Sequence, residues 1–199
     1  MGTSKRGLQT GLKNRVRTVI LFMDSITIRE IPPLRKAWAP IGQPAHVPII
    51  GSHAKRVLSG VLNLVTGTWL SYVSPTFTQA HFQEVLSQVR ACWRGWQIVL
   101  FVDKASAHTA PLSTAWAATL GIQLRWLPTA CPELNIMDCL WRHVRDDVLA
   151  NEPTPTLDLT VQRAIDHLDS LSRHERLVQA GVFSEHFWLA NVRDALLSI

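Results

Sequence analysis

Three aspartates stand where an α/β protein usually presents its functional groups. Asp24 follows the apolar run 16–23, and Asp103 follows a second apolar run, 97–102. Asp138 is expected on a helix, beside its apolar stripe, so that it can face the strand ends. Carboxyl ends of neighbouring strands meet at one edge of a sheet. If these two strands are neighbours, all three carboxylates share one small region.

Carboxylates brought together in this way need neutralisation. Their mutual repulsion amounts to a few kcal/mol even at an effective dielectric constant of about 20. Mg²⁺ and Mn²⁺ prefer hard oxygen ligands and are the natural counter-ions. Two such ions about 3.5–4 Å apart can stabilise both the entering and the leaving oxygen of a phosphoryl displacement. The pattern therefore indicates two-metal phosphoryl transfer.

Simpler explanations exist for each acid taken alone. An aspartate after a strand commonly serves a turn or caps a helix. Asp138 is also compatible with the rim of an amphipathic helix. Glu133 is a rival for the third acid, although its place just after Pro132 favours an interaction with the helix dipole.

Composition limits the class of protein. A chain of 199 residues with 47% apolar and 18% charged residues can fill a core and is too apolar to be disordered. Its formal charge of +5 comes from a basic excess over the first three quarters of the chain, which makes a polyanionic partner plausible.

The sequence also indicates the cellular compartment. No apolar run approaches the ~20 residues that span a bilayer, and no signal segment opens the chain. The three cysteines, Cys92, Cys131 and Cys139, include no CxxC pair. A disulfide scaffold or a four-cysteine zinc site is therefore not expected. We expect a cytoplasmic protein without a membrane partner.

The predicted elements give an α/β fold. We expect strands over 16–23, 56–64, 68–73, 97–102 and 122–127, and helices over 77–93, 111–120, from Pro132 onward, around 161–171 and at the chain end. Hairpin-linked strands followed by alternating units predict a ribonuclease-H-like mixed sheet with helices on both faces. Three units are expected: a basic flexible arm (1–15), a catalytic domain (16–151) and a helical tail (152–199).

Two segments resemble the catalytic core of DDE transposases. These are 102–108 (VDKASAH) and 127–141 (LPTACPELNIMDCLW). Both are similar to the bacterial insertion-sequence branch of the mariner superfamily, and the 34 residues between Asp103 and Asp138 match its spacing. Segments 22–24 and 33–43 resemble the surroundings of the family's first acid. The resemblance covers roughly 16–151.

This resemblance implies a ribonuclease-H-like domain that binds two Mg²⁺ (or Mn²⁺) ions through Asp24, Asp103 and Asp138. Such enzymes hydrolyse a phosphodiester at the transposon ends and then use the freed 3′-hydroxyl to attack target DNA. Double-stranded DNA is the implied partner, and a homodimer is expected. Side chains that match positions near the family's site, and that would support it or position DNA, are Lys104, His108 and Asn135. Those expected to contact phosphates are Arg35, Lys36, Lys55 and Arg56.

Some positions depart from the family pattern. Ser25 replaces a common glutamate, and Lys104 replaces a common asparagine and puts an ammonium beside the expected ions. Only about fifteen residues precede the first strand, too few for the helix-turn-helix units that read transposon ends. We therefore expect a truncated copy or one half of a split frame, assisted by a separate helix-turn-helix chain. The alternatives are an inactive remnant that only binds DNA and a generic ribonuclease-H-type nuclease.

Overall fold

A computed structural model describes residues 17–36, 38–43, 46–48, 52–129 and 131–197. Its sheet has five strands in the order β3-β2-β1-β4-β5. The strands are β1 (Thr18–Arg29), β2 (Lys55–Asn63), β3 (Trp69–Ser74), β4 (Gln97–Val102) and β5 (Ile122–Trp126). β1 pairs antiparallel with β2 and parallel with β4, so the first and fourth strands are the neighbours that the site requires.

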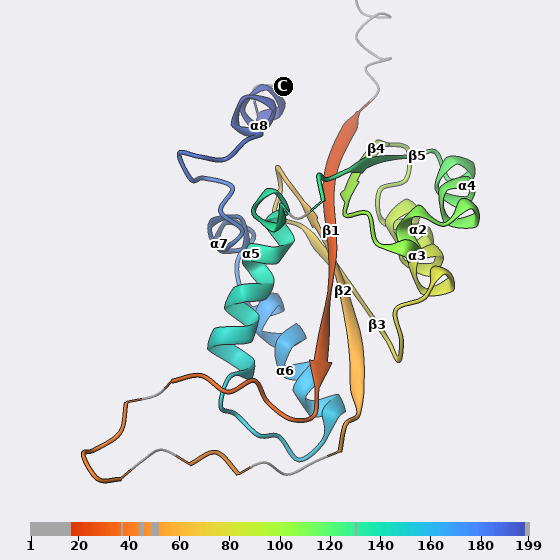
Figure 1. The fold of residues 1–199 in the computed structure, drawn as a ribbon. Coiled ribbons are helices and arrows are strands. Elements are labelled where there is room, and N and C mark those ends of the chain that lie inside the picture. The colour runs from red at the N-terminus through yellow and green to blue at the C-terminus, as the bar shows by residue number, and fades with distance from the viewer. Residues whose placement is uncertain (1–16, 37, 44–45, 49–51, 130, 198–199) are drawn as a thin grey trace, which may run out of the picture.

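Helices cover both faces of this mixed sheet, as predicted (Figure 1). Alternation along β1 directs Ile20 and Phe22 to one face and Leu21 and Met23 to the other. The first face carries α5 (Ile136–His143) and α6 (Leu157–Ser170), and the second carries α2 (Gln79–Cys92), α3 (Ser106–Thr109) and α4 (Pro111–Thr119). Each face has its own hydrophobic core, so β1 is buried between two layers.

The first strand is longer than expected. Its predicted end at residue 23 is wrong, because β1 continues through Asp24 to Arg29. Pairing with β4 does stop at Phe22, but β2 remains hydrogen-bonded to β1 as far as Arg29. Alternating burial of Ile26 and Ile28 gives the extension an apolar side that packs on the core. Asp24 therefore lies inside a strand, just beyond its parallel partner.

The helix expected from Pro132 begins later. A short 3₁₀ turn, η1 (Pro132–Leu134), comes first, and Asn135 then caps α5 by accepting a hydrogen bond from the Met137 amide at 3.2 Å. After His143 the helix continues with wider turns as η2 (Val144–Leu149). An asparagine that satisfies the free amides sets the helix start here, in preference to the proline.

Helices after residue 156 complete the first face. α6 packs Val161, Ala164 and Leu168 into the core beneath β1 and β2. Two shorter helices follow, α7 (Arg173–Gln179), which was not predicted, and α8 (Ala190–Leu197). The expected arm at 1–15 lies outside the described residues. None of the helices in the described part of the chain is long and apolar enough to cross a membrane.

The connection from β1 to β2 extends away from the sheet in Figure 1. Trp38 and Ile41 are fully exposed in it. Trp141, by contrast, is buried under β2. A proline-rich segment has too few apolar neighbours of its own to cover such a large side chain.

Candidate active site

Asp24 lies on the face of β1 that looks toward α5. It is half-buried, and its register partner on β2 is Gly60. The next residue, Ser25, points to the opposite face, where its hydroxyl lies 2.6 Å from that of Ser59. Ser59 in turn lies 2.7 Å from Nε2 of the buried His81. Ser25 therefore belongs to a small polar network with Ser59 and His81.

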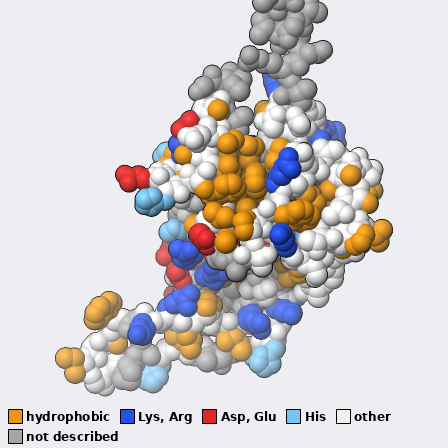
Figure 2. All heavy atoms as spheres, turned by 45° about the horizontal axis from the view of Figure 1, so that its top comes forward, with side chains coloured by type: hydrophobic (Ala, Val, Ile, Leu, Met, Phe, Trp, Pro, Cys, Tyr) orange, Lys and Arg blue, Asp and Glu red, His pale blue; other side chains and the backbone are white. Residues whose placement is uncertain are grey.

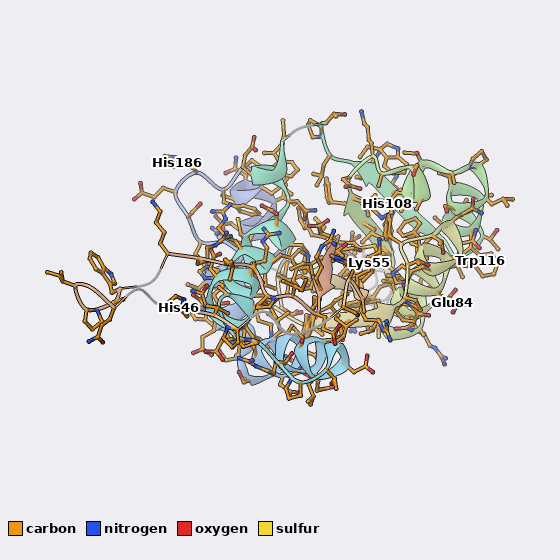
Figure 3. All side chains as sticks on the ribbon, turned by 60° about the horizontal axis from the view of Figure 1, so that its bottom comes forward. His46, Lys55, Glu84, His108, Trp116 and His186 are labelled. Atoms are coloured by element: carbon orange, nitrogen blue, oxygen red, sulfur yellow. The ribbon has the colours of Figure 1, made fainter. Side chains whose placement is uncertain are left out.

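Asp103 directly follows β4, as predicted. One of its carboxylate oxygens accepts a hydrogen bond from the Ala105 amide at 3.1 Å and lies 2.6 Å from Nδ1 of His108. The hydrogen bond with His108 is the main cause that lowers the pKa of Asp103 below its usual value. Packing of the buried His108 ring against Phe77 and Phe82 fixes its position. His108, labelled in Figure 3, therefore orients this carboxylate.

Asp138 lies in the first turn of α5. The capping residue Asn135 also donates from Nδ2 to the carbonyl oxygen of Met23 at 3.2 Å. One buried side chain thus starts the helix and ties it to the residue before Asp24. Asp138 lies three residues further on, where its amide bonds the Asn135 carbonyl at 2.9 Å.

Gly60, the register partner of Asp24 on β2, leaves room for α5 to pack closely on the sheet. A Cβ at this position would lie 2.6 Å from Cε of Met137 and 2.7 Å from Cζ2 of Trp141. Both side chains are buried, and Trp141 is rigid. The absence of a side chain directly across from Asp24 therefore allows the helix that carries Asp138 to pack at that level.

We expect Gly60→Ala to lower the free energy of unfolding by about 1–3 kcal/mol, the usual effect of overpacking a core. Thermal unfolding followed by circular dichroism measures this change. In a Trp141→Phe background, which lacks the contacting ring atoms, the alanine should cost clearly less. Equal costs in both backgrounds would contradict the close approach.

Electrostatics link the three acids. Burial, first of all, and then the charges of Asp103 and Asp138 raise the pKa of Asp24 from 3.8 to about 6. The negative charges of Asp103, which follows β4, and of Asp138, on α5, therefore both repel the Asp24 carboxylate. A half-buried acid that its neighbours repel is suited to a bound cation, and oxygen donors suit Mg²⁺ or Mn²⁺.

The raised pKa predicts a pH-dependent stability. Between about pH 4 and 6 the unfolded chain loses a proton that folded Asp24 retains, so this group makes stability fall as pH rises. A rise from 3.8 to about 6 corresponds to at most about 3 kcal/mol. In EDTA, Asp24→Asn should therefore raise Tm at pH 8 and leave it nearly unchanged at pH 4. A difference in Tm that does not vary with pH would refute this.

Two arginines that sequence reasoning missed contact Asp138. Arg145 Nη2 lies 3.3 Å from Oδ1, and Arg142 Nη2 lies 3.8 Å from Oδ2. The four-residue spacing of Asp138 and Arg142 was a readable signal for one pair. In the described part of the chain, no three His, Cys, Asp or Glu side chains are grouped as a ready set of metal ligands.

The four basic residues expected to contact phosphates do not gather around the acids. Lys55 and Arg56 pair with Arg29 and Ile28, several residues past Asp24 and thus ~13–17 Å further along the sheet. Lys55 is labelled in Figure 3, where the end of the sheet at which β2 begins faces the viewer. Arg56 lies 3.5 Å from Asp158.

The other two lie on the connection that follows β1. Arg35 is paired with Asp146 at 2.9 Å, next to the helix that carries Asp138, and Lys36 is exposed. All four are accessible or nearly so, but none touches an acid of the site among the ion pairs of the described residues.

A pocket of about 270 Å³ opens beside Asp103. It is lined by Lys104, Ala105 and the segment after β5 that includes Pro128. Lys104 is exposed there. Figure 2 shows lysine and arginine side chains on either side of a hydrophobic area on the face that it presents. This face combines apolar contact area with basic groups.

Comparison with known proteins places the chain in a family. Residues 19–160 match the DDE superfamily endonucleases, and the chain belongs to that family. Among solved structures, the Mos1 transposase paired-end complex with the left transposon end has a TM-score of 0.67 at 16% identity, with 98% of this chain and 64% of that chain covered. The Mos1 catalytic domain with raltegravir and Mg has a TM-score of 0.60 at 12% identity, with 98% of both chains covered.

These similarities confirm the predicted ribonuclease-H-like α/β fold. The chain spans 64% of the length of the Mos1 chain in the paired-end complex and nearly all of the isolated catalytic domain. A search of curated proteins found no match.

Proposed function

We propose that this chain is a transposase catalytic domain that cleaves DNA strands and joins the freed 3′-hydroxyl to target DNA. The observation that carries this proposal is the convergence of three acids within the segment that matches the DDE endonucleases. Asp24 lies just past the pairing of β1 with β4, Asp103 follows β4, and the hydrogen bond from Asn135 to Met23 holds the helix of Asp138 against β1. An aspartate that only serves a turn or caps a helix would not lie close to two further carboxylates from different elements.

Asp24, Asp103 and Asp138 would hold two Mg²⁺ or Mn²⁺ ions. When bound, the ions supply charge stabilisation for the entering and leaving oxygens of the phosphodiester. His108 holds the Asp103 carboxylate in one orientation, and Asn135 holds α5 against β1. Mos1 structures with Mg and with Mn support the choice of ion.

Double-stranded DNA is the proposed substrate. Mos1 complexes that contain a transposon end share this fold, and the formal charge of +5 favours a polyanion. We take 16–151 as the catalytic domain, preceded by a basic arm and followed by a helical tail. A dimer on paired ends and a separate helix-turn-helix chain complete the proposal.

The test is a Mn²⁺ titration with a nicked duplex and with a duplex that ends as a transposon end would. Cleavage that rises with Mn²⁺ and stops on addition of EDTA supports the proposal. DNA binding without cleavage at any Mn²⁺ concentration would instead identify an inactive remnant. Preferential cutting of an RNA–DNA hybrid would indicate a generic ribonuclease-H-type nuclease.

A further inference from the structure

Both oxygens of the Asp138 carboxylate face a guanidinium. Arg145 approaches Oδ1 at 3.3 Å, and Arg142 approaches Oδ2 at 3.8 Å. Arg142 lies one helical turn after Asp138 on α5, and Arg145 lies further on, in η2, yet both guanidinium groups reach the Asp138 carboxylate. Asp138 is mostly buried, whereas both arginines are more exposed. The acid is therefore neutralised from its own helix.

A divalent ion and a guanidinium compete for the same carboxylate oxygens. An arginine in contact with Asp138 also repels a cation that enters beside it. We infer that Arg145 and Arg142 are positioning residues that hold Asp138 until a metal ion displaces them. This inference rests on the proposed two-metal function, because it assigns Asp138 to one of the ions.

The strength of such pairs sets the size of the effect. Partly exposed ion pairs between arginine and aspartate are weak, so a cation with several oxygen ligands displaces them readily. The arginines therefore adjust the affinity for the ion without preventing binding. The expected effect of removing Arg145, which makes the shorter contact, is a gain of about 3- to 10-fold in affinity for Mn²⁺.

The experiment measures Mn²⁺ binding to the DNA-free protein by calorimetry or by the electron paramagnetic resonance signal of free Mn²⁺. Arg145→Met should tighten binding about 3- to 10-fold, and Arg142→Met by a smaller factor, since its contact is longer. Arg163→Met is the matched control. Arg163 donates to the Val148 carbonyl at 3.2 Å and pairs with Glu152 at 3.9 Å, so its loss changes the net charge equally without touching Asp138.

A second background separates contact from long-range charge. In Asp138→Asn protein, Arg145→Met should no longer tighten Mn²⁺ binding, because the carboxylate that it competes for is gone. The inference is overturned if Arg145→Met leaves the affinity unchanged or weakens it. An equal gain in the Asp138→Asn background, or in Arg163→Met, overturns it as well. Circular dichroism checks that each variant folds.

Failure of the proposed function gives a different result. If the wild-type chain binds no Mn²⁺, or if Asp103→Asn does not weaken binding, the metal site itself is refuted. If Asp103→Asn weakens binding and Arg145→Met has no effect, only the role of the arginines is refuted.

Discussion

Asp103→Asn should reduce Mn²⁺-dependent DNA cleavage by about 10³-fold or more while the protein stays folded. The substitution removes the negative charge of a proposed metal ligand, and phosphoryl transfer would then lose the charge stabilisation that bound ions supply. An asparagine oxygen can still accept from the Ala105 amide and from His108. Cleavage assays with equal protein concentrations, with Tm measured in parallel, make this comparison.

Asp146→Asn is the matched control for this result. Asp146 is a surface acid that pairs with Arg35, so it undergoes the same chemical change away from the three proposed ligands. Its cleavage rate should stay within about 3-fold of the wild type, as expected of an exposed pair. If Asp103→Asn retains a tenth or more of the wild-type rate, the assignment of Asp103 is wrong.

Asn135→Ala is expected to have the second largest effect. It removes the cap of α5 and the hydrogen bond to the Met23 carbonyl at once. Loss of a cap costs about 1 kcal/mol, and an unpaired buried group adds a similar amount, so stability should fall by about 2 kcal/mol. Displacement of Asp138 should also lower cleavage by about 10- to 100-fold. Thermal unfolding and single-turnover cleavage measure the two effects.

Asn135→Ser separates the two roles. A serine retains a capping oxygen for the Met137 amide but cannot reach the Met23 carbonyl. The helix should therefore regain most of its stability, while the cleavage rate stays low because β1 and α5 are no longer tied. A serine variant as active as the wild type would show that the cap alone positions Asp138.

Much of the fold was predictable because the apolar periodicities are local. The runs 97–102 and 122–127 are dense in bulky apolar residues. The observed β4 and β5 match these predicted strands to within one residue. The spacing of Phe82, Val85, Leu86 and Val89 likewise predicted α2, whose buried face consists mainly of these residues. The position of Asp103 followed from the end of β4.

Errors arose where distant contacts decide local structure. β1 extends past Asp24 because β2 continues to pair with it, from Ser25 with Ser59 to Arg29 with Lys55. The docking of α5 against β1 depends on a hydrogen bond between Asn135 and Met23, which lie 112 positions apart. Neither partner is visible from the other in the sequence.

The site depends on similar long-range contacts. The importance of Gly60 becomes apparent only once Trp141 is packed above it, and the network from Ser25 to His81 requires three elements in register. Arg145 is seven residues from Asp138, beyond the usual helical pairs. Residue types and spacing identified the acids; the side chains that orient or hold them required the folded chain.

The tie between Met23 and Asn135 has a consequence for the order in which the protein matures. Ribosomes release a chain from its N-terminus, so Asp24 and Asp103 emerge well before α5. Until residue 135 leaves the exit tunnel, nothing can draw a third acid toward the other two. We therefore expect nascent chains that stop short of α5 to leave chromosomal DNA uncut.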